Sequence, residues 1–307
     1  MKRHEIMNDE LVYRLLRRMI FLMGHIPVPV ADFFAGVLGR LWFRVDKRHR
    51  EITLDNLTHA FGREWPKDKI ERRARQTFVN IAAMLFEVAW STRLSKSRFL
   101  SHFTIEGLAH VKAAQARGKG VLVISCHMGN FEMLIPAIEG TGFKGYAIYR
   151  KLDFAPLERL MRQLRERFGV TMIPMRGASR KLEEILAQGG VVGTLIDQNV
   201  DWYKGVFADF FGRPACTNSG LARLAMKTGS PVVPLYTIRH GRRFVIRYLP
   251  EVPVAVTGDP IKDVETNTQR FTTAVETMVR QCPDQYFWVH NRWKTKPWCL
   301  WPGRESR

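Results

Sequence analysis

Cysteine is scarce in this 307-residue chain, and its spacing excludes the common metal-binding patterns. The four cysteines stand at positions 126, 216, 282 and 299 and form no C-x-x-C pair. A zinc ribbon needs two such pairs, so that class of site is excluded. Reduced thiols in a protein that faces the cytoplasm are the simplest account of this pattern. We therefore expect no metal and no cofactor.

The chain also lacks the unbroken run of about 20 apolar residues that a membrane-spanning helix needs. Its first ten residues are polar and mixed in charge, so no cleavable signal peptide is expected. Residues 19–43 are mostly apolar but are interrupted by prolines and polar residues, namely His25, Pro27, Pro29, Asp32 and Arg40. Because basic residues flank this stretch, we expect residues 1–50 to form a helical segment that lies on a membrane surface. The alternative is a pair of ordinary helices that pack on the core.

Acidic residues are few. The chain has 29 Asp and Glu against 48 Lys and Arg, which gives a formal net charge of +19 and a pI near 10.2. Such a charge requires an anionic partner, and nucleic acid, an anionic bilayer, an acidic carrier protein and a phosphorylated substrate all qualify. The basic residues are spread along the chain instead of clustering on one recognition element, which argues against nucleic acid.

The remaining chain alternates between predicted strands and helices, without repeats, low-complexity tracts or long linkers. We expect strands at residues 120–125, 145–149, 170–174, 190–196, 231–238 and 243–249. We expect helices at residues 69–91, 108–116, 131–139, 155–168, 179–187, 218–228 and 261–281. This order predicts an α/β fold with a mixed, mostly parallel central sheet and helices on both faces, the pair around Gly241 being antiparallel.

One histidine follows directly after the first predicted strand. Residues 120–125 are apolar and suit a strand buried on both faces, while Gly129 and Asn130 indicate a turn in which Asn130 can cap the next helix. A histidine at a strand end reaches the crevice where α/β proteins bind ligands. Oriented by a carboxylate, it can remove the proton from a hydroxyl that attacks a carbonyl carbon. His127 and Glu132 are the candidates for this pair; the alternative is a half-exposed histidine without a catalytic role.

The residue before His127 and the ends of two further strands carry polar or reactive side chains. Cys126 precedes the histidine, but neighbouring strand residues point to opposite faces, so we expect it to be a buried apolar residue and no nucleophile. Asp197, followed by Gln198, could orient a polar substrate or pair with an arginine. At the end of the 145–149 strand, Tyr149 and Arg150 could bind a phosphate. Turn or surface positions are the alternative for each.

Taken in order, these motifs resemble the late acyltransferases of lipid A biosynthesis, of the lauroyl and myristoyl type, within the glycerolipid acyltransferases that share an H-x4-D/E motif. The resemblance runs from about residue 10 to about residue 297 and rests on six motifs: His127 with Glu132, Tyr149-Arg150, Ile196-Asp197-Gln198, Phe210-Phe211-Gly212, Thr217 and Gln285-Tyr286-Phe287-Trp288-Val289-His290. It implies an acyltransferase domain over residues 51–307 with a glycerol-3-phosphate-acyltransferase-like fold.

The resemblance also implies the reaction and its place. His127 would be the general base that moves a fatty acyl chain from a thioester, generally on acyl carrier protein, to a hydroxyl of a lipid A precursor. Glu132 would hold the histidine ring, and the enzyme would sit on the cytoplasmic side of the cell inner membrane. The sequence leaves open the acyl chain length and whether coenzyme A replaces the carrier protein.

An arginine of the 155–168 helix is a further candidate. Arg165 and Arg167 border its apolar stripe on opposite sides, and periodicity alone does not choose between them. The family places a functional arginine fifteen residues beyond that of the Tyr-Arg pair, and counting from Arg150 gives Arg165. There it could help backbone N–H groups of the turn to stabilise an oxyanion. The alternative is a solvated arginine face.

Tryptophans gather near the C-terminus between basic residues. Trp288, Trp293, Trp298 and Trp301 are four of the eight in the chain. They could contact lipid headgroups or pack the tail on the domain.

Three other functions remain open. A different acceptor, such as a lysophospholipid or a phosphoinositol glycolipid, would keep the mechanism and change only the pocket. A basic nucleic-acid-binding protein and a non-catalytic membrane scaffold would need neither His127 nor Glu132.

Overall fold

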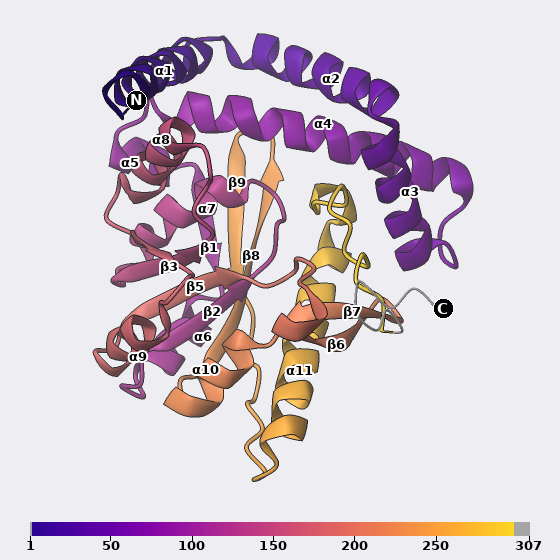
Figure 1. Ribbon diagram of the computed structural model, residues 1–307. Coiled ribbons are helices and arrows are strands. Elements are labelled where there is room, and N and C mark those ends of the chain that lie inside the picture. The colour runs from indigo at the N-terminus through magenta and orange to yellow at the C-terminus, as the bar shows by residue number, and fades with distance from the viewer. Residues whose placement is uncertain (1, 298–307) are drawn as a thin grey trace.

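A seven-stranded sheet forms the centre of the protein (Figure 1). The computed structural model describes residues 2–297. The strands are β1 (Phe103–Glu106), β2 (Val121–Ser125), β3 (Gly145–Tyr149), β4 (Thr171–Pro174), β5 (Val191–Leu195), β8 (Val232–His240) and β9 (Arg243–Tyr248), in the order β1-β9-β8-β2-β5-β3-β4. Only the β8–β9 pair is antiparallel among these neighbours. The predicted mixed, mostly parallel sheet is confirmed, although β1 was not anticipated.

Eleven α-helices are assigned within the described residues. They are α1 (Lys2–Gly24), α2 (Val28–Val45), α3 (Lys47–Phe61), α4 (Lys67–Ser91), α5 (Lys96–Leu100), α6 (Leu108–Gln115), α7 (Phe131–Ala137), α8 (Ala155–Glu166), α9 (Ser179–Ala187), α10 (Gly220–Thr228) and α11 (Pro260–Gln281). α7 ends at Ala137, two residues before the predicted end at residue 139, because Pro136 lies inside it; the chain continues as a 3-10 turn over Ile138–Thr141.

The central strand β2 divides the core in two. Its five residues are all buried, as the apolar run predicted. Leu122 and Ile124 join a cluster formed with residues of α9, α10 and α11. Val121 and Val123 join a second cluster formed with residues of α5, α6 and α7. Because successive strand side chains point to opposite faces, helices cover both faces of the sheet.

A separate hairpin of β6 (Gly205–Phe210) and β7 (Arg213–Asn218) packs against α11. Its two-residue loop, Phe211 and Gly212, has φ of 55° and 76°, the left-handed pair that a tight hairpin turn favours. Phe211 adopts this uncommon conformation while 7% exposed, with its N–H bonded to Glu276 at 2.7 Å. The sequence analysis predicted neither strand of this hairpin.

The N-terminal helices lie across one end of the molecule. α1 packs on α4 and α8, and α2 packs along α4 (Figure 1). The contact with α4 is close, since a Cβ at Gly39 would lie 2.4 Å from the Cα of Val79. α3 continues through residue 50, the predicted boundary of this segment.

Within residues 2–297, no single helix is long and apolar enough to cross a membrane. Taken together, Asn8–Gly24 and Val28–Val45 are long and apolar enough to cross a membrane, but the two helices are bent by 116° at the break between them.

Two C-terminal tryptophans are core residues. Trp288 and Trp293 are 1% and 2% exposed, and the indole N–H of Trp288 donates to the Pro283 carbonyl at 2.6 Å. Contact with lipid headgroups is therefore wrong for these two, and tail packing is correct. Trp298 and Trp301 lie outside the described residues.

Candidate active site

His127 stands at the carboxyl end of β2, beside the end of β5. The two strands are paired in parallel, and Ile196 N–H donates to the Ser125 carbonyl at 3.1 Å, which brings Asp197 next to the histidine. Asp197 Oδ1 lies 2.8 Å from His127 Nδ1, and Asp197 Oδ2 accepts the backbone N–H of His127 at 3.1 Å. Both side chains are largely enclosed, with exposed fractions of 16% and 3%. One carboxylate thus fixes both the ring and the backbone of the histidine.

Burial and charge act in opposite directions on this pair. Burial lowers the pKa of His127, but the charge and hydrogen bond of Asp197, with Glu132 nearby, leave that pKa above its ordinary value. Burial raises the pKa of Asp197, but the charge and hydrogen bonds of His127 leave it below its ordinary value. Each partner therefore favours the charged form of the other, so the site stabilises an imidazolium.

The second ring nitrogen of His127 faces Gln198. Because Nδ1 bonds to a carboxylate, it carries the single proton of the neutral ring, and in that form Nε2 is an acceptor. The side-chain amide nitrogen of Gln198 lies 3.2 Å from Nε2 and can only be a donor there. Gln198 itself is exposed. Nε2 is therefore directed toward the accessible side of the site, where the exposed Gln198 amide is its hydrogen-bond partner.

The C-terminal segment closes the site behind Asp197. Tyr286 is 4% exposed; burial, and then the charge of Asp197, raises the pKa of this phenol well above its ordinary value. Arg292 is 2% exposed and donates to the Cys216 carbonyl at 2.9 Å and to Thr217 Oγ1 at 2.5 Å. Burial lowers the pKa of Arg292, and the charges of Tyr286 and Asp197 oppose this. Thr217 thus holds a buried cation that faces the carboxylate.

Glu132 pairs with Arg165 instead of the histidine. Arg165 Nη2 and Nε donate to the two carboxylate oxygens at 2.6 and 2.8 Å, and the side chains are 13% and 15% exposed for Arg165 and Glu132. The prediction that Glu132 holds the His127 ring is wrong, because Glu132 lies in the first turn of α7, which packs on α8, where Arg165 occupies the last turn. Its charge still acts on the ring at longer range.

Arg167, the other arginine that flanks the α8 stripe, has a different environment. Its guanidinium lies 4.6 Å from the ring centres of both Phe99 and Phe168 and donates to Ser91 Oγ at 3.1 Å. Burial lowers its pKa to about 10. Between the two arginines, the structure therefore brings only Arg165 to the carboxylate of the H-x4-E motif.

The Tyr-Arg pair divides between the interior and the surface. Tyr149 donates to Glu158 at 2.6 Å, and the Arg165 guanidinium lies 5.7 Å from its ring centre. Burial, with the Glu158 hydrogen bond, raises the pKa of Tyr149 to about 12. Arg150 is 80% exposed and pairs with the exposed Asp153 at 3.5 Å. Tyr149 therefore borders the Glu132–Arg165 pair, whereas Arg150 points to solvent.

The turn that carries the histidine is tied to the C-terminal segment. Phe287 N–H donates to the His127 carbonyl and Gly129 N–H donates to the Gln285 carbonyl, both at 2.9 Å. Gly129 has φ of 59°, and a Cβ there would lie 2.4 Å from the Thr237 carbonyl oxygen, so only glycine fits. The Asp197 loop is held in the same way, since Asn199 N–H donates to His290 Nε2 at 2.8 Å. Burial lowers the pKa of His290 to about 4, which keeps it an acceptor.

Two smaller predictions have mixed outcomes. Cys126 is buried, 1% exposed, and burial raises the pKa of its thiol, as expected for an inert residue. Asn130 occupies the N-cap position of α7, but its side chain makes no capping bond. It donates instead to Glu87 Oε2 at 2.8 Å.

Among residues 2–297, no group of three or more His, Cys, Asp or Glu side chains is arranged to hold a metal ion.

Comparison with known proteins identifies the family. The family model for "Bacterial lipid A biosynthesis acyltransferase" matches residues 7–295. A lipid A biosynthesis lauroyltransferase and a palmitoleoyltransferase of Escherichia coli (strain K12) are 25% and 26% identical, each covering 91% of this chain and 90% of the relative. A phosphatidylinositol mannoside acyltransferase of Mycobacterium tuberculosis is 27% identical over 54% of each chain. The chain therefore belongs to the bacterial lipid A biosynthesis acyltransferase family and is an acyltransferase.

Proposed function

We propose that this enzyme moves a fatty acyl chain from an acyl-carrier-protein thioester to a hydroxyl of a lipid A precursor, with His127 as the general base. The strongest support is the state of the His127 ring. Its Nδ1 is held by a buried carboxylate at 2.8 Å, which leaves the unprotonated Nε2 on the accessible side of the site. A base in that state needs only an acceptor hydroxyl in place of the Gln198 amide.

The reaction can then proceed in two steps. His127 Nε2 removes the proton of the acceptor hydroxyl while its oxygen forms a bond to the thioester carbonyl carbon, which gives a tetrahedral intermediate. Collapse of the intermediate breaks the carbon–sulfur bond, and the imidazolium returns its proton to the departing sulfur. Asp197 stabilises the imidazolium between the two steps, as the carboxylate of a serine-hydrolase triad does. The acceptor hydroxyl takes the place of the serine, so no acyl-enzyme is required.

Arg165 is suited to a role beside the base. Burial lowers its pKa, but the hydrogen bond and charge of Glu132 raise it overall, so the guanidinium remains charged. The carboxylate occupies Nε and one Nη2 proton, which leaves other N–H groups free in a fixed orientation. These could bind the thioester oxygen as its negative charge develops, or a phosphate of the acceptor. Glu132 therefore acts by fixing Arg165.

A narrow crevice of about 10 Å³ lies next to this pair, between α4, α7 and α8, with Glu132 and Arg165 at one side. It would have to widen to admit an acyl chain. Val88, Met133, Met161 and Leu164 supply the apolar lining. Methionine side chains rearrange easily, which suits a site that must admit a flexible hydrocarbon.

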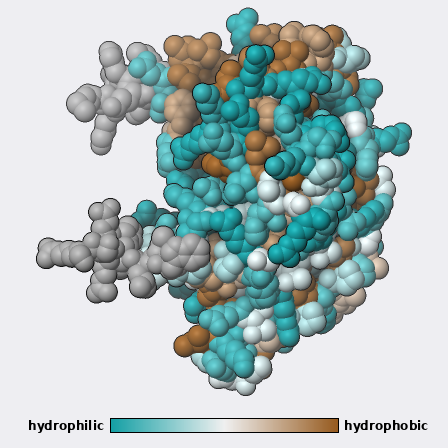
Figure 2. All heavy atoms as spheres, turned by 90° about the vertical axis from the view of Figure 1, so that its right-hand side faces the viewer, coloured by the Kyte–Doolittle hydropathy of each residue, from teal (hydrophilic) through white to brown (hydrophobic). Residues whose placement is uncertain are grey.

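The outer face of α1 and α2 supports attachment to a membrane surface. Twelve large apolar side chains on these helices are 42–66% exposed: Leu11, Leu15, Met19, Phe21, Leu22, Val30, Phe33, Phe34, Val37, Leu38, Leu41 and Val45. Figure 2 shows apolar residues gathered along the upper edge of the molecule, where these helices lie. We define these twelve residues as the N-terminal apolar face. Apolar area of this extent is unusual on a monomer, and basic residues beside it favour an anionic bilayer.

The acceptor is tested by assaying three lipids in parallel with purified enzyme and acyl carrier protein loaded with a fatty acid. A lipid A precursor, a lysophospholipid and a phosphoinositol glycolipid would be offered in mixed micelles, with the products identified by mass spectrometry. We expect acyl transfer to the lipid A precursor, and none in the His127→Ala variant. Transfer only to the phosphoinositol glycolipid would contradict the proposed acceptor, and would agree with the more distant mycobacterial relative.

A further inference from the structure

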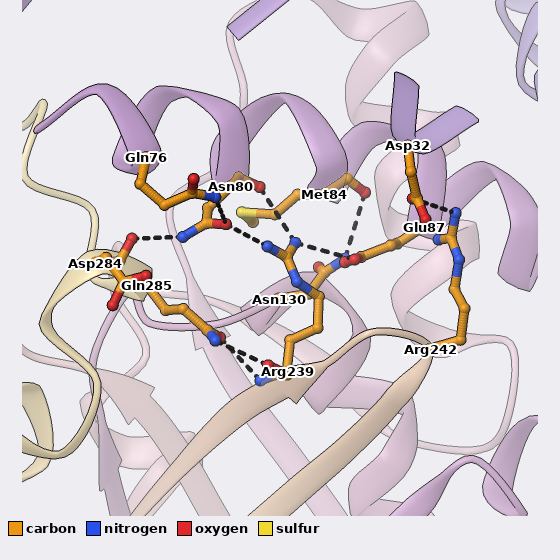
Figure 3. Close-up of polar contacts among 10 residues, drawn as sticks. All are labelled: Asp32, Gln76, Asn80, Met84, Glu87, Asn130, Arg239, Arg242, Asp284 and Gln285. Carbon is orange, nitrogen blue, oxygen red and sulfur yellow. Dashed lines mark hydrogen bonds and ion pairs between the residues drawn. The ribbon is translucent and has the colours of Figure 1, made fainter. Parts of the chain in front are cut away.

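A buried polar network lies behind the turn that carries His127 (Figure 3). It connects three parts of the fold: the middle of α4, the end of β8, and the turn that leads into α7. Glu87 of α4 and Arg239 of β8 form an ion pair at 3.0 Å, with only 3% and 12% of their side chains exposed. Neither residue contacts His127, Asp197 or the Glu132–Arg165 pair in any of their described hydrogen bonds.

Asn130 links this ion pair to the site. Its side chain is 0% exposed, and its amide nitrogen donates to Glu87 Oε2 at 2.8 Å and to the Met84 carbonyl at 3.3 Å. The amide oxygen has no hydrogen-bond partner within the described residues, although it is buried. A buried acceptor without a partner costs free energy, so the favourable contribution of the Asn130 side chain is its hydrogen bond to Glu87.

The hydrogen bond between Asn130 and Glu87 matters because of where Asn130 lies in the chain. Asn130 lies three residues after His127 and two before Glu132, at the junction of turn and helix. It therefore sets where α7 begins relative to the histidine. A shift of this junction would move Glu132, and with it Arg165, relative to His127 Nε2.

A second connection runs from Arg239 to the same turn. The side-chain amide of Gln285 accepts the Arg239 N–H and donates to the Arg239 carbonyl, both at 2.8 Å. The Gln285 carbonyl in turn accepts the Gly129 N–H at 2.9 Å. Arg239 also donates to Asn80 Oδ1 at 2.5 Å, which anchors it to α4. The Arg239 guanidinium is thus connected to Asn130 through Glu87, and the Arg239 backbone is connected to Gly129 through Gln285.

We propose that Glu87 and Arg239 are positioning residues that act through Asn130 to hold His127 in register with the Glu132–Arg165 pair. This rests on the proposed role of His127 as the base. Stability alone is a poor reason for such a pair, because replacing both partners of a buried ion pair by apolar residues is often neutral or stabilising. Apolar residues at these two positions would not supply the fixed hydrogen-bond acceptor that Glu87 offers to Asn130.

The test separates activity from stability. The double variant Glu87→Leu/Arg239→Leu removes both charges together and takes the Glu87 acceptor from Asn130, which leaves only the longer contact with the Met84 carbonyl at 3.3 Å. We expect its melting temperature to stay close to that of the wild type, while kcat falls about 10- to 100-fold, the loss that a displacement near 1 Å can cause. KM for donor and acceptor should change little, because neither residue contacts substrate.

Two single variants and a control complete the design. Glu87→Gln keeps an oxygen acceptor for Asn130, so it should lose stability but retain most of kcat. Asn130→Ala leaves the ion pair intact, so it should fold and show the loss in kcat of the double variant. Gln76→Ala is the matched control, since Gln76 donates to Asn80 Oδ1 at 3.0 Å in the same network without reaching Asn130; it should be fully active.

The outcomes are distinct. Wild-type kcat in the double variant and in Asn130→Ala would overturn the positioning role. A kcat that follows melting temperature across all four proteins would also overturn it, since the network would then be only structural. His127→Ala in the same assay checks the proposed function separately: if it remains active, the base is wrong whatever the network does.

Discussion

Asp197 Oδ1 lies 2.8 Å from His127 Nδ1, although 70 positions separate the two residues in the chain. The carboxylate of the H-x4-E motif, only five positions from the histidine, bonds instead to Arg165 at 2.6 and 2.8 Å. The site therefore contains two ion pairs with separate tasks. In the proposed mechanism one makes the histidine a base, and the other fixes a guanidinium beside it.

His127→Ala should abolish acyl transfer without unfolding the protein. Loss of a general base typically costs about 10²–10⁴ in rate, and the side chain stands at the carboxyl end of β2, outside the core clusters. Initial rates and circular dichroism of the purified variant would check this. Cys126→Ala is the neighbouring control and should keep most of its activity, because that thiol is buried and protonated. A His127→Ala rate within tenfold of wild type would contradict the assignment.

Asp197→Asn should change the pH dependence in a definite direction. The base is the neutral ring, so kcat/KM rises with pH through the pKa of His127, which the Asp197 charge holds above its ordinary value against the effect of burial. Without that charge burial dominates, the pKa falls, and the ascending limb moves to lower pH. The plateau should also drop, because asparagine no longer selects the correct tautomer. Rates measured from pH 5 to about 9 would show this; a limb that moves upward would exclude the His127–Asp197 pair.

Glu132→Ala and Arg165→Ala should each reduce activity strongly, and the double variant should lose little more than either one. Each carboxylate oxygen of Glu132 bonds to Arg165, so either single change destroys the same pair. A double-mutant cycle on kcat/KM measures this coupling. Arg150→Ala is the control, because Arg150 is 80% exposed. Additive losses would mean that the two residues act independently on the reaction.

Local sequence patterns were sufficient for much of the fold. The 145–149 strand and the 179–187 helix coincide with β3 and α9, because clear turn residues bound each run. The β6–β7 hairpin was missed because its turn contains Phe211 at positive φ, where a glycine or asparagine is the usual signal. Packing on α11 stabilises that hairpin, and a sequence pattern does not reveal such a contact.

The sequence named each residue of the two ion pairs as a candidate, but it did not predict how they pair. His127, Glu132, Arg165 and Asp197 were all candidates, and the structure brings them together as two pairs. A short sequence spacing favoured Glu132 as the partner of the histidine. Because β2 pairs in parallel with β5, Asp197 is the partner of His127 instead, and this pairing depends on the order of the strands in the sheet. Glu87 was missed because a carboxylate in the middle of an ordinary helix carries no signal of its own.

Attachment to membranes should depend on the N-terminal apolar face. Replacing Phe33 and Leu41, which are 66% and 53% exposed, by aspartate should shift the protein from the membrane fraction to the supernatant. The matched control is Val256→Asp, since Val256 is 68% exposed but lies far along the chain from α1 and α2. Deleting residues 1–45 should have the same effect, with some aggregation. High salt and alkaline washing should release the intact chain; if they never do, the segment is inserted more deeply than a surface helix.

The acyl donor should be acyl carrier protein, and salt should reveal it. Acyl carrier protein is small and strongly acidic, so an enzyme with a formal charge of +19 attracts it over a distance. Transfer from it should slow steeply as ionic strength rises from about 50 to about 300 mM, because the Debye length contracts to below about 8 Å. Acyl-coenzyme A, assayed beside it with the same micellar acceptor, should be much slower at low salt. Equal rates from the two donors, with the same salt dependence, would show that the basic surface serves only the membrane and the acceptor.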